Sequence, residues 1–144
     1  MVKVEWQGKM AFLARMEDGT GFLMDAGAAD GGEDSGPSPV QAFLASAAAC
    51  SAMDVISILR KMRQEVYAYR VEVVHERVPK GQWPRPITSI TMNHFLSGKD
   101  LDPAAVAKAV ELSDTKYCSV LATLRETPEL KSVWKIEEGA PSGQ

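Results

Sequence analysis

The stretch SPVQAFLASAAACSAMDVISILRKMRQE, residues 38–65, decides the fold, because it predicts one long helix. Ser38 is a favourable N-cap, Pro39 suits the first helical position, and Gln41 completes a Ser-x-x-Gln capping box. No glycine or further proline follows within the stretch. At 1.5 Å per residue, the predicted helix, 39–65, is about 40 Å long.

Most of this helix is apolar or small on every side, so every side needs to be covered. A domain of 144 residues has a radius of gyration of only about 15 Å and can hardly wrap so long a helix. We therefore expect a second subunit, with the small residues at 45–49 and 51–52 letting two backbones approach closely. The alternative is a central helix in the core of a monomer. A membrane span is not expected, because serines and Asp54 interrupt the stretch and alanine supplies much of it.

The rest of the chain predicts a strand-rich α+β domain that spans residues 1–144 as one unit. The first 26 residues alternate like a three-stranded meander. The acidic, glycine-rich segment 27–37 predicts a mobile surface loop. Further elements are predicted as an antiparallel hairpin of strands 66–78 and 87–98, a helix at 101–116 capped by Asp102, a short helix at 117–127, a strand at 129–139 and a frayed tail at 139–144.

Composition and charge narrow the function classes. The net charge is −3 and no large basic cluster is present, which argues against a nucleic-acid or anionic-membrane partner. The first ten residues lack the apolar core of a secretory signal, so a reduced, cytoplasmic protein is expected. The two cysteines stand 68 positions apart, which fits neither a disulfide scaffold nor a zinc site with local ligand spacing, and no metal is expected.

Cys50 and Asp54 form an unusual pair within the apolar helix. Cys50 lies about three turns from the helix start, beyond the reach of the helix dipole. Asp54, at i+4, shares its face, and a carboxylate there disfavours a thiolate. Buried carboxylates are normally paired, so we expect a cation from elsewhere in the protein to lie beside Asp54 or to face the sulfur of Cys50. Lys9 and Arg15, from the N-terminal strands, are the candidates, and the sequence does not choose between them.

Cys118 has a different setting, close to the start of a predicted helix with Asp114 or Thr115 as its cap. At that position the helix dipole favours a thiolate. A structural alternative remains open for both cysteines, because a lone cysteine is often a small buried core residue. His75 and His94 both fall in predicted strands, and nothing in their spacing supports a Cys–His catalytic pair or a Cys₂His₂ metal site.

Two segments, GPSPVQAFLASAAACSAMDVISILRKMR (36–63) and GKDLDPAAVAKAVELSDTKYCSVLATL (98–124), resemble the osmotically induced protein C and organic hydroperoxide resistance family (OsmC/Ohr), closest to its YhfA-like branch. The resemblance implies an intertwined homodimer, with antiparallel sheets wrapped around two long central helices. It further implies a two-cysteine peroxidase that reduces organic hydroperoxides. Cys50 matches the cysteine that becomes a sulfenic acid, and Cys118 matches the one that resolves it. No bound cofactor is implied, only an external dithiol reductant.

The chain also departs from the pattern of the family's peroxidases. They carry a glutamate just after the proline that opens the long helix, and it holds an arginine that faces the reactive thiol. Val40 and Gln41 occupy those positions here, and the nearest matches to the arginine are Lys9 and Arg15. Asp54 follows the usual pattern of the branch, and we expect it to pair with a basic side chain across the dimer axis.

Three functions follow from these observations. The first is a peroxidase whose apolar pocket, lined by Phe43, Met53 or residues of a partner, favours bulky organic hydroperoxides. The second is a catalytically weak dimer that binds a small molecule or responds to redox conditions. The third is a purely structural role for both cysteines. The matching pair of cysteines favours the first.

Overall fold

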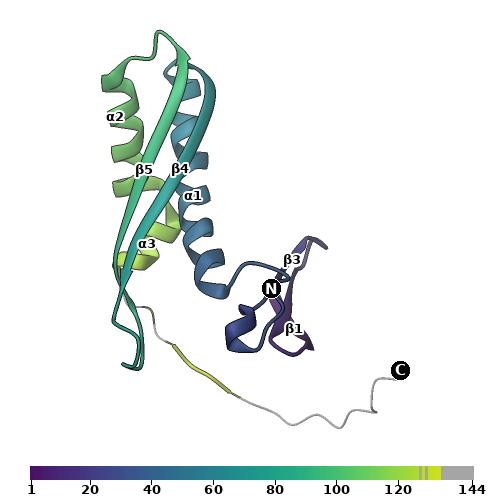
Figure 1. Ribbon diagram of the computed structural model, residues 1–144. Coiled ribbons are helices and arrows are strands. Elements are labelled where there is room, and N and C mark those ends of the chain that lie inside the picture. The colour runs from purple at the N-terminus through teal and green to yellow at the C-terminus, as the bar shows by residue number, and fades with distance from the viewer. Residues whose placement is uncertain (127, 129, 134–144) are drawn as a thin grey trace.

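The computed structural model describes residues 1–126, 128 and 130–133 (Figure 1). The three N-terminal strands form one small sheet that lies beyond the N-terminal end of the long helix, whereas the remaining helices and the long hairpin form a taller body (Figure 1). In chain order the elements are β1 (Val2–Gly8), β2 (Ala11–Met16), β3 (Gly21–Met24), η1 (Ala28–Asp30), α1 (Pro39–Lys61), β4 (Glu65–Arg77), β5 (Ile87–Lys99), α2 (Pro103–Leu112), η2 (Ser113–Tyr117) and α3 (Ser119–Arg125).

The N-terminal sheet is the predicted antiparallel meander, with strand order β1-β2-β3. The segment that follows it is organised around the buried carboxylate of Asp25. This carboxylate accepts hydrogen bonds from the Ser35 hydroxyl at 2.7 Å and from the backbone N–H groups of Glu33 and Ser35. These bonds lower the pKa of Asp25 to about 2, with the Ser35 hydroxyl contributing most. The predicted loop 27–37 therefore contains a 3₁₀ turn and internal hydrogen bonds; its mobility stays a prediction.

Helix α1 begins as predicted. The Ser38 hydroxyl accepts a hydrogen bond from the Gln41 N–H, and the Gln41 side chain accepts one from the Ser38 N–H at 2.8 Å. Its predicted end at residue 65 was wrong by four residues, because Arg63 adopts a left-handed conformation (φ 58°) without a glycine. The Gln64 N–H then bonds back to the Leu59 carbonyl, which closes the helix as a Schellman motif does.

Strands β4 and β5 form a two-stranded antiparallel hairpin that packs along α1 and α2 (Figure 1). The buried core lies where the C-terminal half of α1 meets α2, at Val55, Ile58, Leu59 and Ala109. Partly buried side chains from the hairpin, among them Val66, Tyr69 and Leu96, cover this core.

After α2, which Asp102 caps as predicted, the predicted helix does not continue regularly to residue 116. Residues 113–117 instead form a π-helical turn, and α3 follows it after a single extended residue, Cys118. Of the strand predicted at 129–139, residues 130–133 are described and do not form a strand, whereas its other residues and the predicted frayed tail lie outside the described residues.

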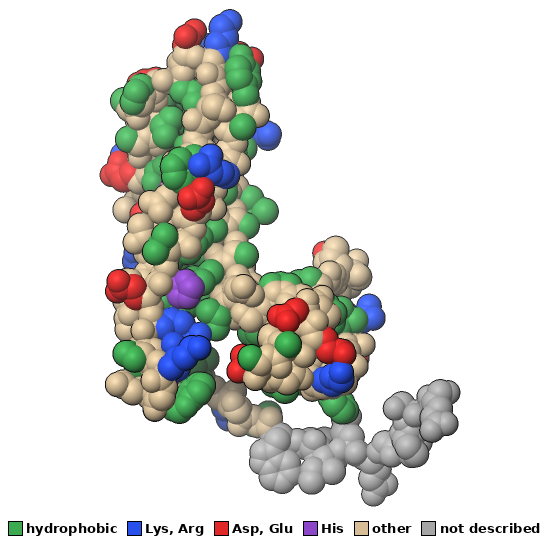
Figure 2. Space-filling view, viewed as in Figure 1, with side chains coloured by type: hydrophobic (Ala, Val, Ile, Leu, Met, Phe, Trp, Pro, Cys, Tyr) green, Lys and Arg blue, Asp and Glu red, His purple; other side chains and the backbone are tan. Residues whose placement is uncertain are grey.

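By length and composition, α1 is able to cross a membrane, but the core helix of a soluble protein meets the same criteria. Only 39% of its most apolar 18-residue stretch is buried within the chain. Figure 2 shows hydrophobic side chains at the surface of both the taller body and the N-terminal sheet. Exposed apolar residues include Phe43 and Met53 on α1 and Trp6 and Phe22 on the sheet. A single chain therefore leaves part of the predicted core helix uncovered.

Candidate functional site

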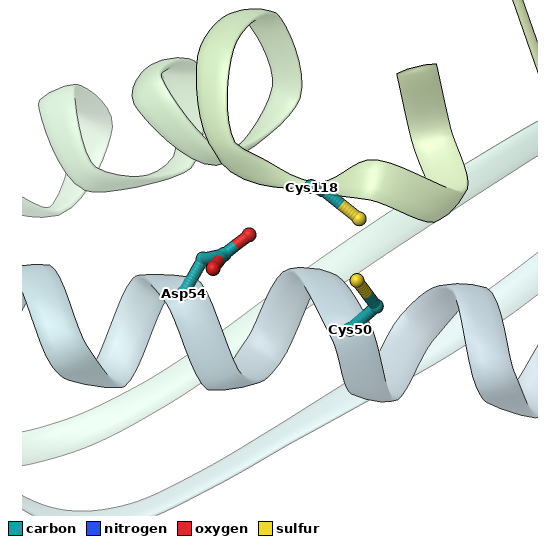
Figure 3. Close-up of side chains that lie close together, drawn as sticks. All are labelled: Cys50, Asp54 and Cys118. Atoms are coloured by element: carbon teal, nitrogen blue, oxygen red, sulfur yellow. The ribbon is translucent and has the colours of Figure 1, made fainter. Parts of the chain in front are cut away.

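Three side chains that are potential nucleophiles or ligands meet between α1 and the segment that joins α2 to α3. Cys50 and Asp54 point from α1 towards this segment, and Cys118 points back at them (Figure 3). The two sulfurs and a carboxylate oxygen of Asp54 all lie within 4.8 Å of one another. Both cysteines are free thiols. Residues 68 positions apart in the sequence therefore form one cluster, which we call the thiol–carboxylate cluster.

The helix geometry of α1 explains half of this arrangement. Cys50 and Asp54 are four residues apart, so they lie one above the other on the same face of α1. Burial of Val55 and Leu59 in the core fixes the rotation of the helix, since both side chains are fully buried. The face that carries Cys50 and Asp54 then lies against the π-helical turn.

The π-helical turn explains the other half. The Cys118 N–H donates to the Ser113 carbonyl at 3.0 Å, a bond that spans five residues and ends the turn. Cys118 is itself the N-cap of α3, and its sulfur accepts a hydrogen bond from the Leu121 N–H at 3.5 Å. The prediction that Asp114 or Thr115 caps this helix was therefore wrong, because the turn places both of them before the cap.

The expected stabilisation of a Cys118 thiolate was also wrong in its net direction. Cys118 is only 2% exposed, and burial raises the pKa of its thiol, with the neighbouring Cys50 thiol adding to the rise. The N–H of Leu121 opposes this effect but is the smaller influence. Cys50, by contrast, is partly exposed. A small molecule from solvent therefore reaches Cys50 more easily than Cys118.

A buried polar network supports Asp54. The Ser113 hydroxyl lies 3.3 Å from Asp54 Oδ2 and 3.1 Å from the Ser51 hydroxyl, and both serines are fully buried. Among the described residues Asp54 makes no ion pair. Lys61 lines the same cavity of about 400 Å³ as Asp54 without pairing with it.

The sequence singled out neither serine. Ser51 lies one turn before the unusual aspartate, three residues away on the same helix, and this spacing was the available signal. Ser113 carried no signal, because a serine near the end of an amphipathic helix normally faces solvent.

An open cavity of about 540 Å³ lies on the α3 side of the molecule, and no residue of the thiol–carboxylate cluster lines it. It is bounded by α1, β5, the end of α2 and α3, and its lining residues include Phe43, Met92, His94, Val110, Leu121 and Leu124. Leu121 belongs to the first turn after Cys118, so the cavity adjoins the segment that carries this thiol. The prediction that Phe43 lines an apolar pocket agrees with this geometry. Met53 lines none of the described cavities and is 72% exposed.

His94, which lines this cavity, contacts Tyr69 on the neighbouring strand of the hairpin. The Tyr69 hydroxyl lies 2.6 Å from His94 Nδ1, and the two rings stack with their centroids 5.9 Å apart. Burial lowers the pKa of His94, although the charge of Asp114 opposes this, and burial raises the pKa of Tyr69 to about 12. His75 lies opposite Ile90 on the hairpin. Neither histidine belongs to the thiol–carboxylate cluster.

Within one chain, the other predicted site residues are not brought to Cys50. Gln41 is held in the capping box, about 13 Å from Cys50 along the axis of α1. Lys9 pairs with Glu33 and Arg15 pairs with Glu5, all on or beside the separate N-terminal sheet (Figure 1). A role for either cation at Cys50 therefore requires a second subunit.

Comparison with known proteins places this site in a family. Residues 32–133 match the family model described as OsmC-like protein. Over 134 residues, 93% of this chain and 96% of the relative, the sequence is 37% identical to Protein YhfA of Escherichia coli K12. A solved hypothetical protein from Aquifex aeolicus VF5 is 31% identical, with a TM-score of 0.73 over 87% of this chain and 86% of that one.

A protein of Legionella pneumophila, described as an organic hydroperoxide resistance protein OsmC, shares the fold with a TM-score of 0.64. At 14% identity over 87% of this chain and 88% of that one, it shows the fold alone. OsmC-like proteins are generally soluble, and their combination of helices with antiparallel sheet matches the architecture described above. The chain belongs to the OsmC-like family.

Proposed function

We propose that the protein is a thiol-dependent peroxidase that reduces organic hydroperoxides. The observation that supports this most directly is the meeting of Cys50 and Cys118, two free thiols whose sulfurs lie within 4.8 Å of each other. A disulfide requires an S–S distance of about 2.05 Å, so the sulfurs need to approach by less than about 3 Å. The proposal is also consistent with the names of two proteins that share the fold, which are described as hydroperoxide resistance proteins, one of them as putative.

Cys50 is the residue that attacks the peroxide, because it is partly exposed whereas Cys118 is buried with a raised pKa. Its thiolate attacks the terminal oxygen of the hydroperoxide, a sulfur–oxygen bond forms, and the oxygen–oxygen bond breaks. The leaving alkoxide takes up a proton and departs as the alcohol. Cys50 is left as a sulfenic acid, oxidised by two electrons.

Cys118 resolves this sulfenic acid. Its sulfur attacks Cys50, the sulfur–oxygen bond breaks, and the departing hydroxide takes the Cys118 thiol proton to form water. The product is a Cys50–Cys118 disulfide. An external dithiol then reduces it by exchange, leaving two protein thiols and an oxidised dithiol. This cycle needs no bound cofactor.

The substrate class follows from the surroundings of the thiols. The cavity of about 540 Å³ near Cys118 has an apolar part, which includes Phe43 and Leu121, and a polar part, which includes Asp114 and Arg125. Such a cavity holds the organic part of a bulky hydroperoxide better than it holds hydrogen peroxide, which has no apolar surface to bury. A net charge of −3 adds no attraction to nucleic acids. Two free thiols suit a reducing, cytoplasmic setting.

We further propose that the working unit is a homodimer in which a second copy covers the exposed side of α1. The apolar residues exposed on α1 and on the N-terminal sheet support this, because contiguous exposed apolar surface marks an interaction site. A second copy is also required for Lys9 or Arg15 to face Cys50. That arrangement supplies the cation that favours a reactive thiolate.

Consumption of an organic hydroperoxide by the reduced protein, with a dithiol in excess, tests the function. The wild type is expected to turn over, the Cys50→Ser variant to be inactive, and the Ser97→Ala variant to match the wild type. Ser97 is an exposed residue on β5, outside α1 and the thiol–carboxylate cluster, and serves as the control. Equal, slow consumption by the wild type and Cys50→Ser contradicts the proposal and favours a weakly reactive binding module instead.

A further inference from the structure

The thiol–carboxylate cluster brings together three groups that all become anions on deprotonation. Within the residues that the structure describes, no lysine or arginine forms an ion pair with Asp54. The half-buried Asp54 carboxylate has the Ser113 hydroxyl as its described partner, although carboxylates removed from water are normally paired with a cation. A bound cation supplies that partner. We propose that Cys50, Asp54 and Cys118 bind one zinc ion, a site that is separate in its chemistry from the peroxidase reaction.

The spacing of the three donor atoms suits a zinc ion. Zn²⁺ binds thiolate sulfur at about 2.3 Å and carboxylate oxygen at about 2.0–2.2 Å, in tetrahedral geometry. These lengths place two ligating sulfurs about 3.8 Å apart and a sulfur and an oxygen about 3.5 Å apart. The observed donors all lie within 4.8 Å of one another, so side-chain movements of about 1 Å close the site.

Groups around the cluster orient its ligands. The Ser113 hydroxyl bonds to Oδ2 of Asp54 at 3.3 Å, and Oδ1 makes no hydrogen bond among the described residues. The Leu121 N–H donates to the sulfur of Cys118, a bond that favours the thiolate which zinc requires. Hydrogen-bonded outer partners of this kind hold first ligands in place at zinc sites.

Asp54 lines a cavity of about 400 Å³ together with Lys61 and Tyr117, and neither cysteine lines it. In the proposed site the ion enters from this Asp54 side, and a water completes its coordination. Three protein ligands and an open fourth position are typical of zinc sites that keep a bound water.

Ligand chemistry selects among metals. Two sulfur donors exclude Mg²⁺ and Ca²⁺, which prefer six or more oxygen ligands. A Cys₂Asp set with three negative charges suits the borderline-soft, divalent zinc ion and leaves a site charge of only −1. Zinc bound here occupies both thiols. With zinc bound, Cys50 and Cys118 are therefore unable to react with a hydroperoxide, whereas in the metal-free chain they are able to.

Titration of the metal-free, fully reduced chain with Zn²⁺ against a chromophoric chelator tests the site. The proposal expects one zinc ion per chain, and Co²⁺ in place of zinc should give sulfur-to-metal charge-transfer absorption. Asp54→Asn should weaken zinc binding by at least about tenfold, the lower end of the loss seen when even an outer partner is removed. Cys50→Ser and Cys118→Ser should each reduce the charge-transfer absorption.

Asp100→Asn is the matched control, an exposed aspartate outside the cluster whose left-handed conformation (φ 45°) asparagine also adopts. It should bind zinc as the wild type does. Thermal unfolding of the metal-free variants shows whether they are folded. Equal affinity in folded Asp54→Asn and in the wild type, or a cobalt spectrum without thiolate bands, overturns the proposal. Neither result bears on the peroxidase, which is assayed in the metal-free chain.

Discussion

The buried hydroxyl of Ser113 links the two elements that carry the site, and its removal gives a quantitative test of the structure. Ser113 and Ser51 are both fully buried, and their hydroxyl oxygens are 3.1 Å apart. The Ser113→Ala variant removes this contact together with those to the Ser51 carbonyl and to Asp54, both at 3.3 Å. It leaves the Ser51 hydroxyl buried without this partner. A lost hydrogen bond that leaves a buried partner unsatisfied costs about 1–3 kcal/mol.

The expected loss in the free energy of unfolding is therefore about 2 kcal/mol. For a chain of this size, that loss lowers the Tm by about 4–8 °C. Urea unfolding measures the loss in the free energy of unfolding. The protein concentration is kept the same for all variants, because a dimer gains stability with concentration. The Ser97→Ala variant is the control, since this serine is exposed on β5 and its side chain makes no hydrogen bond among the described residues. It should stay within about 0.5 kcal/mol of the wild type.

A double-mutant cycle between Ser113→Ala and Asp54→Asn isolates the link between the two side chains. We expect a coupling of at least about 0.5 kcal/mol, because the residues are in direct contact. A Ser113→Ala variant as stable as Ser97→Ala refutes the reasoning. It would mean that the network between α1 and the π-helical turn does not hold them together.

Three further predictions concern the loop, the hairpin and the proposed dimer. Hydrogen bonds hold the pKa of Asp25 near 2, so its stabilisation of residues 26–35 is complete above about pH 4 and is lost as the pH falls through about 2. Protection of the Glu33 and Ser35 amides from hydrogen exchange should drop over that interval, and unchanged protection contradicts this. Burial lowers the pKa of His94, so the unfolded chain binds more protons and stability falls as the pH drops below about 6.5. The His94→Gln variant should show a weaker pH dependence in urea unfolding, and equal slopes contradict the assignment. Met53 is 72% exposed on α1, and Met53→Glu should convert a dimer into a 15.6 kDa monomer in sedimentation velocity, whereas Trp83→Glu in the hairpin loop should not. A wild type that is already monomeric contradicts the proposed dimer.

Local signals in the sequence were sufficient to predict most of the elements. Ser38, Pro39 and Gln41 fix the start of α1 through contacts within four residues, and the observed capping box confirms them. Alternation likewise predicted the hairpin: its strands, expected at 66–78 and 87–98, are observed at Glu65–Arg77 and Ile87–Lys99. The end of α1 was not predicted, because Arg63 adopts a left-handed conformation that is uncommon for arginine. The π-helical turn at 113–117 has no known sequence signature, so it was read as regular helix.

The site was less predictable, because it depends on contacts between distant segments. Spacing alone could not bring Cys118 to Cys50, and only the family resemblance paired them. The structure also accounts for an acidic residue within the apolar helix. Asp54 accepts a hydrogen bond from Ser113, which lies in the same segment as Cys118. Residues expected to assist from the N-terminal sheet, Lys9 and Arg15, make their ion pairs on or beside that sheet. Their place in a dimer stays a prediction.

The most direct test of the proposed function is the intact mass of the reduced, metal-free chain after one equivalent of an organic hydroperoxide. The wild type should rapidly lose the mass of two hydrogens as the Cys50–Cys118 disulfide forms. The Cys118→Ser variant should instead gain one oxygen, because its sulfenic acid has no resolving thiol. An unchanged mass in both proteins would contradict the account and show that the meeting of the two thiols does not make Cys50 reactive.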